Sequence, residues 1–293
     1  MNDFPEVYVI MLTYNHSEDT RQALISLRGL TYPHVRLLVI DNQSTDETVS
    51  MVRRDFPEVT LVINPTNLGF AAGINVGIHY AIESGAKLVL LINNDVVVAP
   101  DMLDHLVAAL EDDVGATAPL IYYLDDPTRI WSAGFNRHPL IWEMRGGARD
   151  ALDTGQWSVP FEVDYLLGCA LLLNCDVLQK VGFFDECYFF YYEDLDLSWR
   201  IQKSGYPLLT VPQAHMWHKG SGSAGSSSEF RVYHMARSST IFFRSHAVGW
   251  RRFVIFLFRV GSALRKSWNF AFAGKFQHLR ALWRGMCDGW QIS

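Results

Sequence analysis

The chain has 293 residues, a length that suits one large α/β domain with an appendage or two modest domains. Hydrophobic residues make up 49% and charged residues 19%, which allows a sizeable core and excludes a wholly disordered chain. The net charge of −6 combines a basic tail, with 11 Lys and Arg and one acid in residues 231–293, and an acidic body, with 14 Lys and Arg and 30 acids.

The cysteines and the first residues of the chain indicate in which cellular compartment the protein works. The four cysteines, at positions 169, 175, 187 and 287, match neither a zinc knuckle nor a CxxC redox pair in their spacing. In a chain of this length we expect reduced, mostly buried thiols in a cytosol-like compartment. The first residues carry an acid at position 3 and no basic stretch, so we do not expect a secretory signal.

The first 123 residues alternate between apolar runs typical of buried strands and amphipathic runs typical of helices. Strands are expected at 7–13, 35–40, 59–63, 87–92 and 115–123, and helices at 18–27, shortly after position 45, at 70–83 and at 101–110. Ser44 or Thr45 is expected to cap the second helix. Continuous apolar strands alternating with helices predict an α/β fold with a mostly parallel sheet and helices on both faces.

Polar residues follow four of these strands, at the edge of the sheet where ligands bind in such folds. They are Thr13, Tyr14 and Asn15; Asp41, Asn42 and Ser44; Asn67 and Gly69; and Asn93, Asn94 and Asp95. One such cluster alone would be an ordinary turn, but four on one edge favour a binding site. An aspartate at a strand end suits a divalent cation, because hard cations prefer oxygen ligands and a diphosphate can supply the rest. The sequence contains no P-loop and no GxGxxG at a strand end. An ATPase and a dinucleotide oxidoreductase therefore lack their usual sequence support.

The alternation of strands and helices stops in the middle of the chain and then returns. Residues 124–163 lose the alternation and are expected to form hairpins in a loop-rich insertion, whose aromatic residues either line an acceptor groove or simply pack. A strand and a short helix are expected in 164–182. The next helix begins with the acids Glu193, Asp194 and Asp196 and runs to about Lys203. Asp194 follows an aromatic stretch, so we expect partial desolvation to raise its pKa towards that of a useful base.

A further strand leads to His215 and His218 and then to a Gly/Ser-rich tract, 220–228. A single histidine is more often structural than a ligand. The composition of the tract predicts a flexible linker, and its position also suits a loop that closes over a bound substrate. Both readings remain open from the sequence.

The tail from about residue 249 has helical spacing of apolar residues, with basic residues on another face. The apolar positions are Phe253, Leu257, Val260, Leu264 and Trp268, and the basic ones are Arg252, Arg259 and Lys266. The apolar run falls short of the roughly 20 residues that a membrane span needs. An amphipathic basic helix lying on an anionic membrane surface is favoured over a helix packed on the domain with a solvated basic face.

Seven stretches, in order, resemble those of family 2 glycosyltransferases with the GT-A fold, and especially the bacterial rhamnosyltransferase-like members that build cell-surface polysaccharides. They are VIMLTYN (9–15), LLVIDNQSTDET (37–48), NLGFAAGINVGI (67–78), LLINNDVVVAPDML (90–103), GCALLLNCDVLQKVGFFDE (168–186), FYYEDLDLSWRIQKSGY (190–206) and HMWHKGSGS (215–223). The resemblance implies a GT-A domain in 1–230, with a nucleotide-binding half (1–123) and an acceptor-binding and catalytic half (124–230). A basic amphipathic helical tail, 231–293, follows.

The resemblance also implies roles for single residues. Asp95 matches the last acid of the family's DxD metal motif, Asn93 stands in place of the first, and His218 matches a histidine that reaches the metal, Mg²⁺ or Mn²⁺. Asp194 matches the catalytic base. Donor binding is implied for Thr13, Tyr14, Asn15, Asp41, Ser44, Asn67, Gly69, Asn93 and Asn94, and an acceptor-side position for Glu193, Gly168 and Trp199.

The expected function is therefore inverting transfer of a sugar from a nucleotide diphosphate donor to a hydroxyl of a cell-surface glycan or lipid-linked saccharide. L-Rhamnose from dTDP-rhamnose is the favoured donor, the expected place is the cytoplasm at the inner face of the cell membrane, and no nucleic-acid partner is expected. A sugar-phosphate nucleotidyltransferase and a non-catalytic membrane-docked scaffold remain as alternatives. The stretch TYNHSED after the first strand is acidic and lacks glycine, which counts against the former.

Overall fold

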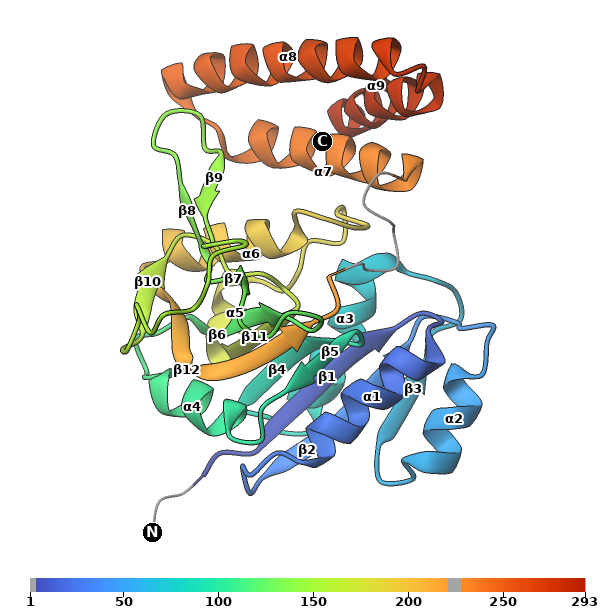
Figure 1. Cartoon of the computed structure of the whole chain (residues 1–293), viewed down its shortest axis with the longest axis vertical. Helices are drawn as coiled ribbons and strands as arrows, with labels where there is room; N and C mark the ends of the chain where they lie inside the picture. Colours follow the sequence, from blue (N-terminus) through green and yellow to red (C-terminus); the bar gives the residue numbers. More distant parts are fainter. Residues whose placement is uncertain (1–3, 221–227, 293) are drawn as a thin grey trace.

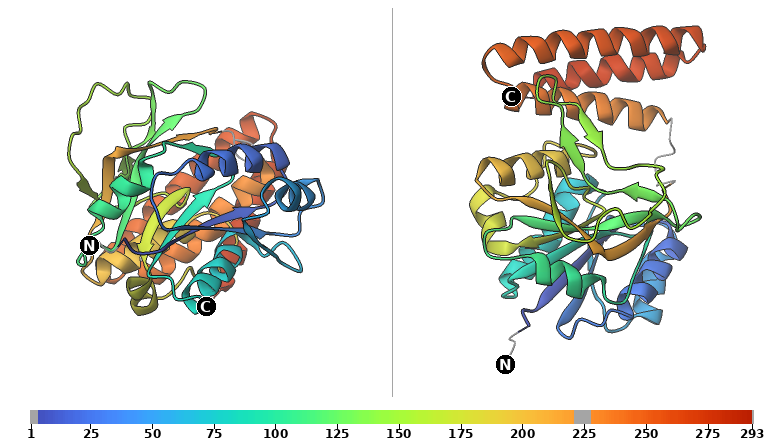
Figure 2. Two further views of the ribbon diagram at one scale, coloured as in Figure 1. Left: turned by 90° about the horizontal axis from the view of Figure 1, so that it is seen from below. Right: turned by 60° about the vertical axis from the view of Figure 1, so that its left-hand side comes forward.

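The computed structural model describes residues 4–220 and 228–292 and has a large mixed sheet at its centre (Figure 1). The main path of this sheet runs in the order β10-β12-β6-β11-β4-β1-β2-β3, with β5 paired to β12 and β7 paired to β6. Helices cover both faces, and three C-terminal helices form a further layer over one end, which the right-hand view of Figure 2 shows. The predicted α/β class and its mostly parallel first half are confirmed.

The first half consists of four parallel strands and the helices between them. They are β1 (Val7–Thr13), α1 (Ser17–Arg28), β2 (Val35–Asp41), α2 (Thr48–Asp55), β3 (Thr60–Ile63), α3 (Gly69–Glu83), β4 (Leu88–Asn93) and, after it, α4 (Met102–Ala109). Side chains of successive strand residues point to opposite faces. Val9 therefore belongs to the core that includes Leu24 of α1, whereas Ile10 belongs to the core that includes Ile74 of α3.

The capping residue predicted for the second helix is wrong. Helix α2 begins at Thr48, and the Oδ1 of Asp46 accepts a hydrogen bond from its backbone N–H at 2.9 Å. Ser44 instead accepts a hydrogen bond from the N–H of Asn15, in the loop after β1, at 2.7 Å. The side chain is therefore committed to a neighbouring strand-end loop rather than to the helix that follows it.

The second half of the sheet is mixed. It contains β5 (Val96–Val98), β6 (Ala116–Tyr123), β11 (Ala170–Asn174) and β12 (Leu208–His218). Strand β11 runs antiparallel to β4 and β6, and the short β5, which the sequence did not predict, runs antiparallel to the end of β12. This last pairing places Val96 opposite His218, so the residues on either side of it are brought together.

The insertion and the following helices agree with the sequence. Short strands β7 (Ile130–Ser132), β8 (Phe135–Arg137), β9 (Met144–Gly146) and β10 (Phe161–Val163) replace the earlier alternation, and β8 and β9 form the predicted hairpin. Helix α5 (Cys175–Val181) ends before Gly182, and α6 (Glu193–Lys203) has the predicted bounds. The hairpin rises towards the C-terminal helices in Figure 1.

The tail forms α7 (Glu229–His246), α8 (Gly249–Phe272) and α9 (Phe276–Gln291). Glycines of α9 allow its close approach to α7, because a Cβ at Gly289 would lie 2.5 Å from the carbonyl oxygen of Arg237. Helix α7 is tied to α6 by a hydrogen bond of 2.6 Å between His246 Nε2 and Asp196 Oδ1. In residues 4–220 and 228–292, no helix has both the length and the apolar character needed to cross a bilayer.

Candidate functional site

The polar clusters predicted from the sequence meet at one edge of the sheet. Strands β4, β1, β2 and β3 are neighbours in that order and run parallel, so their carboxyl ends lie together. Leu12 pairs with Asn93, and Thr13 pairs with Asp41. The loops after these strands therefore form a single edge at which a ligand can touch several of them.

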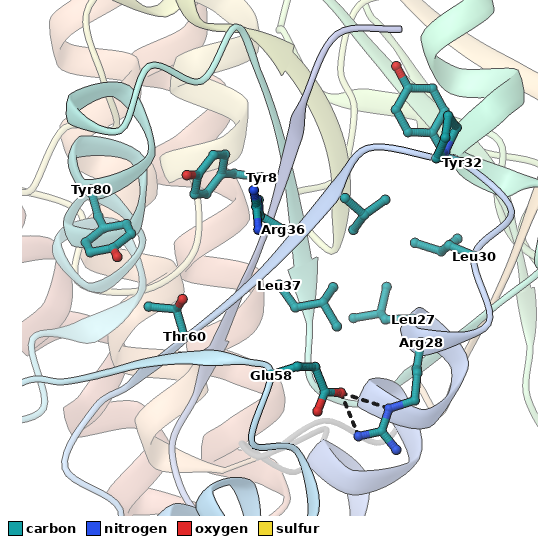
Figure 3. Close-up of a pocket in the computed structure, with 12 residues that line it drawn as sticks. Tyr8, Leu27, Arg28, Leu30, Tyr32, Arg36, Leu37, Glu58, Thr60 and Tyr80 are labelled. Atoms are coloured by element: carbon teal, nitrogen blue, oxygen red, sulfur yellow. Dashed lines mark hydrogen bonds and ion pairs between the residues drawn. The ribbon is translucent and has the colours of Figure 1, made fainter.

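A hollow of about 440 Å³ lies at the other edge, near the amino ends of the first three strands (Figure 3). Tyr8 of β1 and Thr60 of β3 line it, and Arg28 donates a hydrogen bond of 2.6 Å to Glu58 there. Ligands of parallel sheets bind at the carboxyl ends of the strands. This hollow is therefore separate from the candidate site.

The loops after β1 and β2 are joined by hydrogen bonds. The N–H of Asn15 donates to Ser44 Oγ at 2.7 Å, and the N–H of Thr45 donates to Asn15 Oδ1 at 2.8 Å. Asn15 adopts a left-handed φ of 60°, a conformation that asparagine tolerates better than most residues. Tyr14 beside it is 44% exposed. The two loops thus form one unit that leaves an aromatic ring accessible at the edge.

Asp41 has one carboxylate oxygen without a partner. The residue is fully buried, and its Oδ2 accepts a hydrogen bond from the N–H of Ser44 at 2.8 Å. Its Oδ1 is buried and has no hydrogen-bond partner among the described residues. A buried acceptor left unpaired costs free energy. A ligand that brings an N–H group to this oxygen would recover that free energy.

Other predicted donor-binding residues hold the edge together. Asn94 Nδ2 donates to Thr13 Oγ1 at 3.2 Å and to Thr20 Oγ1 at 3.1 Å, which links the end of β4 to α1. Asn67 Oδ1 accepts from the N–H of Gly69 at 2.9 Å and fixes the start of α3. Gly69 has a φ of +79°, which favours glycine. The roles of these residues towards a donor stay predictions.

Asp95 and His218 lie against each other because β5 pairs with the end of β12. Their Oδ1 and Nε2 atoms are 3.4 Å apart, and both side chains are largely buried. His218 Nδ1 accepts a hydrogen bond from the N–H of Gly220 at 2.8 Å, and Trp131 stacks on its ring at 4.5 Å. Burial lowers the pKa of His218, although Asp95 partly offsets this. The neutral ring therefore carries its proton on Nε2, towards Asp95.

A carboxylate oxygen and an imidazole nitrogen that converge in this way fit two positions of a divalent cation. No group of three or more His, Cys, Asp or Glu side chains that could hold a metal occurs in the described part of the chain. The remaining ligands would thus come from a substrate, from water or from other oxygen atoms of the protein. Ligation through Nε2 also requires the ring proton to leave that atom, and Nδ1 can take it only if the hydrogen bond from Gly220 breaks.

Asp194 stands in the first turn of α6 and accepts three hydrogen bonds. Tyr165 Oη and the N–H of Gly168 donate to its Oδ2 at 2.8 and 3.0 Å, and the N–H of Leu195 donates to its Oδ1 at 2.8 Å. Burial raises the pKa of Asp194, and the bonds from Gly168 and Tyr165 counter part of this effect. The predicted direction of the pKa shift agrees with this burial, and the part of the aromatic stretch in it stays a prediction.

Glu193 directly precedes this carboxylate and is buried, with 6% of the residue exposed. Its Oε2 has no hydrogen-bond partner among the residues described. Burial, and then the charge of Asp194, raise the pKa of Glu193 well above its ordinary value. Of the two neighbouring carboxyl groups, Glu193 is the one that holds its proton more readily.

The end of β4, two residues before the predicted metal residue Asp95, and the predicted base contact the same short segment, residues 168–169. The N–H of Asn93 donates to the carbonyl of Cys169 at 3.0 Å, and the N–H of Gly168 donates to Asp194. Burial raises the pKa of the Cys169 thiol, and the carboxylates of Asp95 and Asp194 raise it further. Both carboxylates therefore lie close enough to Cys169 to influence its ionisation, and their joint role in one site stays a prediction.

Trp199 lies further along α6 in an aromatic cluster. Its ring is 4.6 Å from that of Trp142, in the loop between β8 and β9, and Arg137 stands 4.0 Å over it. The hydrogen bonds to Asp194 come from Tyr165, Gly168 and Leu195, so Trp199 is not among its hydrogen-bond donors in the described part of the chain. The position of Trp199 on the acceptor side stays a prediction.

Three contact residues were not found from the sequence. Tyr165 binds Asp194 from 29 positions away, Trp131 stacks on His218, and the N–H of Lys219 donates to the carbonyl of Asp95 at 3.1 Å. No motif or spacing signals such distant pairs. Trp131 could be noted only as one aromatic of the insertion.

Comparisons with known proteins find the family that the residue pattern resembles. The family model described as "Glycosyl transferase family 2" matches residues 8–180. The chain belongs to glycosyl transferase family 2. Its curated relatives in this family include the N-acetylglucosaminyl-diphospho-decaprenol L-rhamnosyltransferase of Mycobacterium tuberculosis, 29% identical over 268 residues, with 83% of this chain and 86% of the relative covered. The dTDP-rhamnosyl transferase RfbF of Shigella flexneri is 23% identical, with 72% and 68% covered.

Solved structures support the fold of this family 2 member. The mannosyltransferase PcManGT from Pyrobaculum calidifontis, in complex with GDP-Man and Mn²⁺, matches with a TM-score of 0.59 at 18% identity, covering 100% of this chain and 77% of that chain. GalNAc-T7 with UDP, GalNAc and Mn²⁺ matches with a TM-score of 0.61 at 15% identity, covering 85% and 52%. This chain thus spans about half the length of the latter. The predicted GT-A fold is confirmed, and the chain is a glycosyltransferase.

Proposed function

We propose that this glycosyltransferase transfers L-rhamnose from dTDP-rhamnose, with inversion, to a hydroxyl of a lipid-linked saccharide. The observation that carries the inverting reaction is that Asp194, with its raised pKa, contacts Gly168, while the next residue, Cys169, accepts a hydrogen bond from Asn93, two residues before Asp95. The names of the Mycobacterium and Shigella relatives support rhamnose as the sugar. The name of the former supports a polyprenyl diphosphate saccharide as the acceptor.

The nucleoside of the donor is proposed to bind at the loops after β1 and β2. The buried Oδ1 of Asp41 lacks a partner in the described structure, and the N3–H of a thymine ring is a donor of the right kind. Tyr14 offers an exposed aromatic ring beside this loop. A base stacked on Tyr14 with its imide edge at Asp41 would satisfy both groups.

The diphosphate is proposed to lie near Asp95 and His218, which would hold Mg²⁺ or Mn²⁺. When bound, such a cation neutralises the negative charge that develops on the leaving diphosphate. Because Asn93 stands in place of the first acid of the metal motif, the site has one carboxylate fewer than that motif provides. We therefore propose that the cation binds weakly without the nucleotide and firmly with it.

Asp194 is proposed as the base that accepts the proton of the acceptor hydroxyl. The acceptor oxygen forms a bond to the anomeric carbon while the bond from that carbon to the diphosphate oxygen breaks, and the diphosphate leaves with the electron pair. A single displacement inverts the anomeric configuration. General base catalysis of this kind contributes about 10²- to 10⁴-fold to rate, so Asp194→Asn is expected to lose activity by that factor.

The test is transfer by the purified full chain with Mn²⁺ and a short-chain polyprenyl diphosphate N-acetylglucosamine. dTDP-rhamnose, UDP-sugars and GDP-sugars are compared as donors, and the anomeric configuration of the product is read by NMR. We expect product from dTDP-rhamnose with the inverted configuration. A retained configuration would overturn the mechanism, and preference for another donor would overturn the proposed sugar. Activity with a nucleoside triphosphate and a sugar phosphate would instead favour the nucleotidyltransferase.

A further inference from the structure

Helix α8 exposes its apolar stripe instead of burying it. Trp250, Phe253, Leu257, Leu264 and Trp268 recur at spacings of three, four, seven and four, which places them on one face of the helix. Their exposed fractions run from 53% for Leu257 to 68% for Trp268. An amphipathic helix of a soluble domain normally packs this face on its core, so the stripe is without a protein partner in the described structure.

The opposite face of α8 packs on the protein and carries part of the basic pattern. Ile255 and Ala263 are buried on it. Arg259 donates a hydrogen bond to Ser239 Oγ of α7, and its guanidinium lies 4.9 Å over the ring of Phe243. Arg259, which the sequence placed on a separate basic face, thus anchors the helix. The helix is held with its apolar stripe outward.

Helix α9 continues this surface. Phe276, Trp283 and Trp290 recur every seven residues, and their exposed fractions lie between 40% and 63%. Gly285 and Gly289 lie on the other side of α9, against α7. Trp283 Nε1 donates to Ser267 Oγ of α8 at 3.0 Å, which joins the two helices. In Figure 1, α8 is the layer farthest from the central sheet.

The charge of this segment indicates what covers it. Residues 247–287 contain eight Lys and Arg and no Asp or Glu. Exposed tryptophans next to cations are typical of helices that lie in the interface of an anionic bilayer, where the rings reach the acyl boundary and the cations meet phosphates. A second copy of the same surface would bring like charges together, which is unfavourable.

We propose that the outer surface of α8 and α9 docks on an anionic lipid bilayer, with the apolar stripe of α8 inserted at the headgroup level. This contact would hold the chain at the membrane as a peripheral protein. The proposal does not depend on the identity of the transferred sugar, because its readout is binding to vesicles and not turnover.

The test is sedimentation of the full chain with vesicles of phosphatidylcholine alone or with roughly one-third phosphatidylglycerol. We expect binding to the anionic vesicles and at least about tenfold weaker binding to the neutral ones. The double variant Leu257→Ser, Trp268→Ser is expected to lose at least about tenfold in partition to anionic vesicles, since two exposed apolar side chains no longer insert. The variant Arg251→Glu, which reverses a charge 5.8 Å from the ring of Trp250 in the stripe, is expected to weaken binding in a salt-dependent manner.

The matched control is Ile25→Ser, Val159→Ser, which removes two apolar side chains of similar exposure, 57% and 66%, from the body of the protein. It is expected to bind vesicles like the unaltered chain. Thermal unfolding of each variant checks that the fold is retained. No sedimentation with anionic vesicles, or equal binding by the Leu257 and Trp268 double variant, would overturn the proposal. A dimer that this double variant converts to a monomer, without vesicle binding, would assign the surface to a second copy.

Discussion

Replacing Tyr165 with phenylalanine removes one hydrogen bond from the carboxylate that we propose as the base. The hydroxyl of Tyr165 donates to Asp194 Oδ2 at 2.8 Å, and its ring stacks on Phe135 at 5.5 Å. Phenylalanine keeps the stacking and leaves the hydrogen bonds from Gly168 and Leu195 in place. The substitution therefore alters the ionisation of Asp194 without removing its other supports.

The size of the effect follows from what this bond stabilises. A hydrogen bond to a charged group contributes about 1.5–3 kcal/mol, and the bond from Tyr165 favours the ionised form, so it lowers the pKa of Asp194. Without it, that pKa rises further, and less of the base is ionised at low pH. At about 1.4 kcal/mol per factor of ten, turnover on the acidic limb should fall by about 10- to 150-fold. At high pH Asp194 is ionised in both enzymes, and their rates should converge.

The assay is turnover, measured as release of nucleoside diphosphate at saturating substrates from about pH 5 to about pH 9. The matched control is Tyr122→Phe, which removes a hydroxyl that donates to Asp153 at 2.6 Å, in a contact that does not include Asp194. It should leave the pH profile unchanged. A Tyr165→Phe enzyme whose rate is lowered by the same factor at every pH would refute the reasoning, because the hydroxyl would then not act through ionisation of the base.

Three further predictions concern ionisation, donor binding and packing. The folded protein raises the pKa of Glu193, so this residue adds stability below its ordinary pKa of about 4.5, and that stability is lost as pH rises through the folded value. Glu193→Gln should therefore be more stable than the unaltered chain at alkaline pH, and the gain should vanish in acid. The exposed control Glu162→Gln should show no such pH-dependent gain in denaturant unfolding. Asp41→Asn should weaken dTDP binding about tenfold or more in calorimetry, because its amide would turn a donor towards the base; unchanged affinity would remove Asp41 from the donor site. Gly289→Ala should cost about 1–3 kcal/mol in unfolding, since its Cβ would meet a carbonyl of α7, whereas Gly261→Ala in α8 has open space and should be neutral or stabilising; equal effects would contradict the packing.

Much of the edge that carries the site was predictable because it depends on local patterns. Apolar runs fix where parallel strands end, so the convergence of Thr13, Asp41 and Asn93 follows from alternation alone. The start of α6 at Glu193 was equally readable, since acids favour a helix amino terminus. The aromatic residues before Asp194 led us to expect burial and a raised pKa, and burial does raise the pKa of Asp194.

The parts that escaped prediction depend on contacts between distant segments. The three residues of β5 are too short to show a period, and only the pairing with β12 makes them a strand and sets Asp95 beside His218. Ser44 had two possible partners, and the distant one, Asn15, prevailed. The spacing in α8 revealed two faces, but spacing cannot say which of them meets the protein.

The support of Asp194 extends past residue 230. Arg237 of α7 donates to the carbonyl of Cys187 at 2.7 Å, and Ser238 donates to the carbonyl of Phe190 at 3.0 Å. Both carbonyls belong to the loop that leads into α6, where Tyr192 takes a left-handed φ of 73° just before the acids. A fragment that ends at residue 230 would leave these oxygens without their donors. The strained backbone at Tyr192 would then lack the nearby hydrogen bonds from α7. Shortening the protein to its sheet and nearest helices should therefore yield a poorer catalyst, because α7 helps to shape the centre.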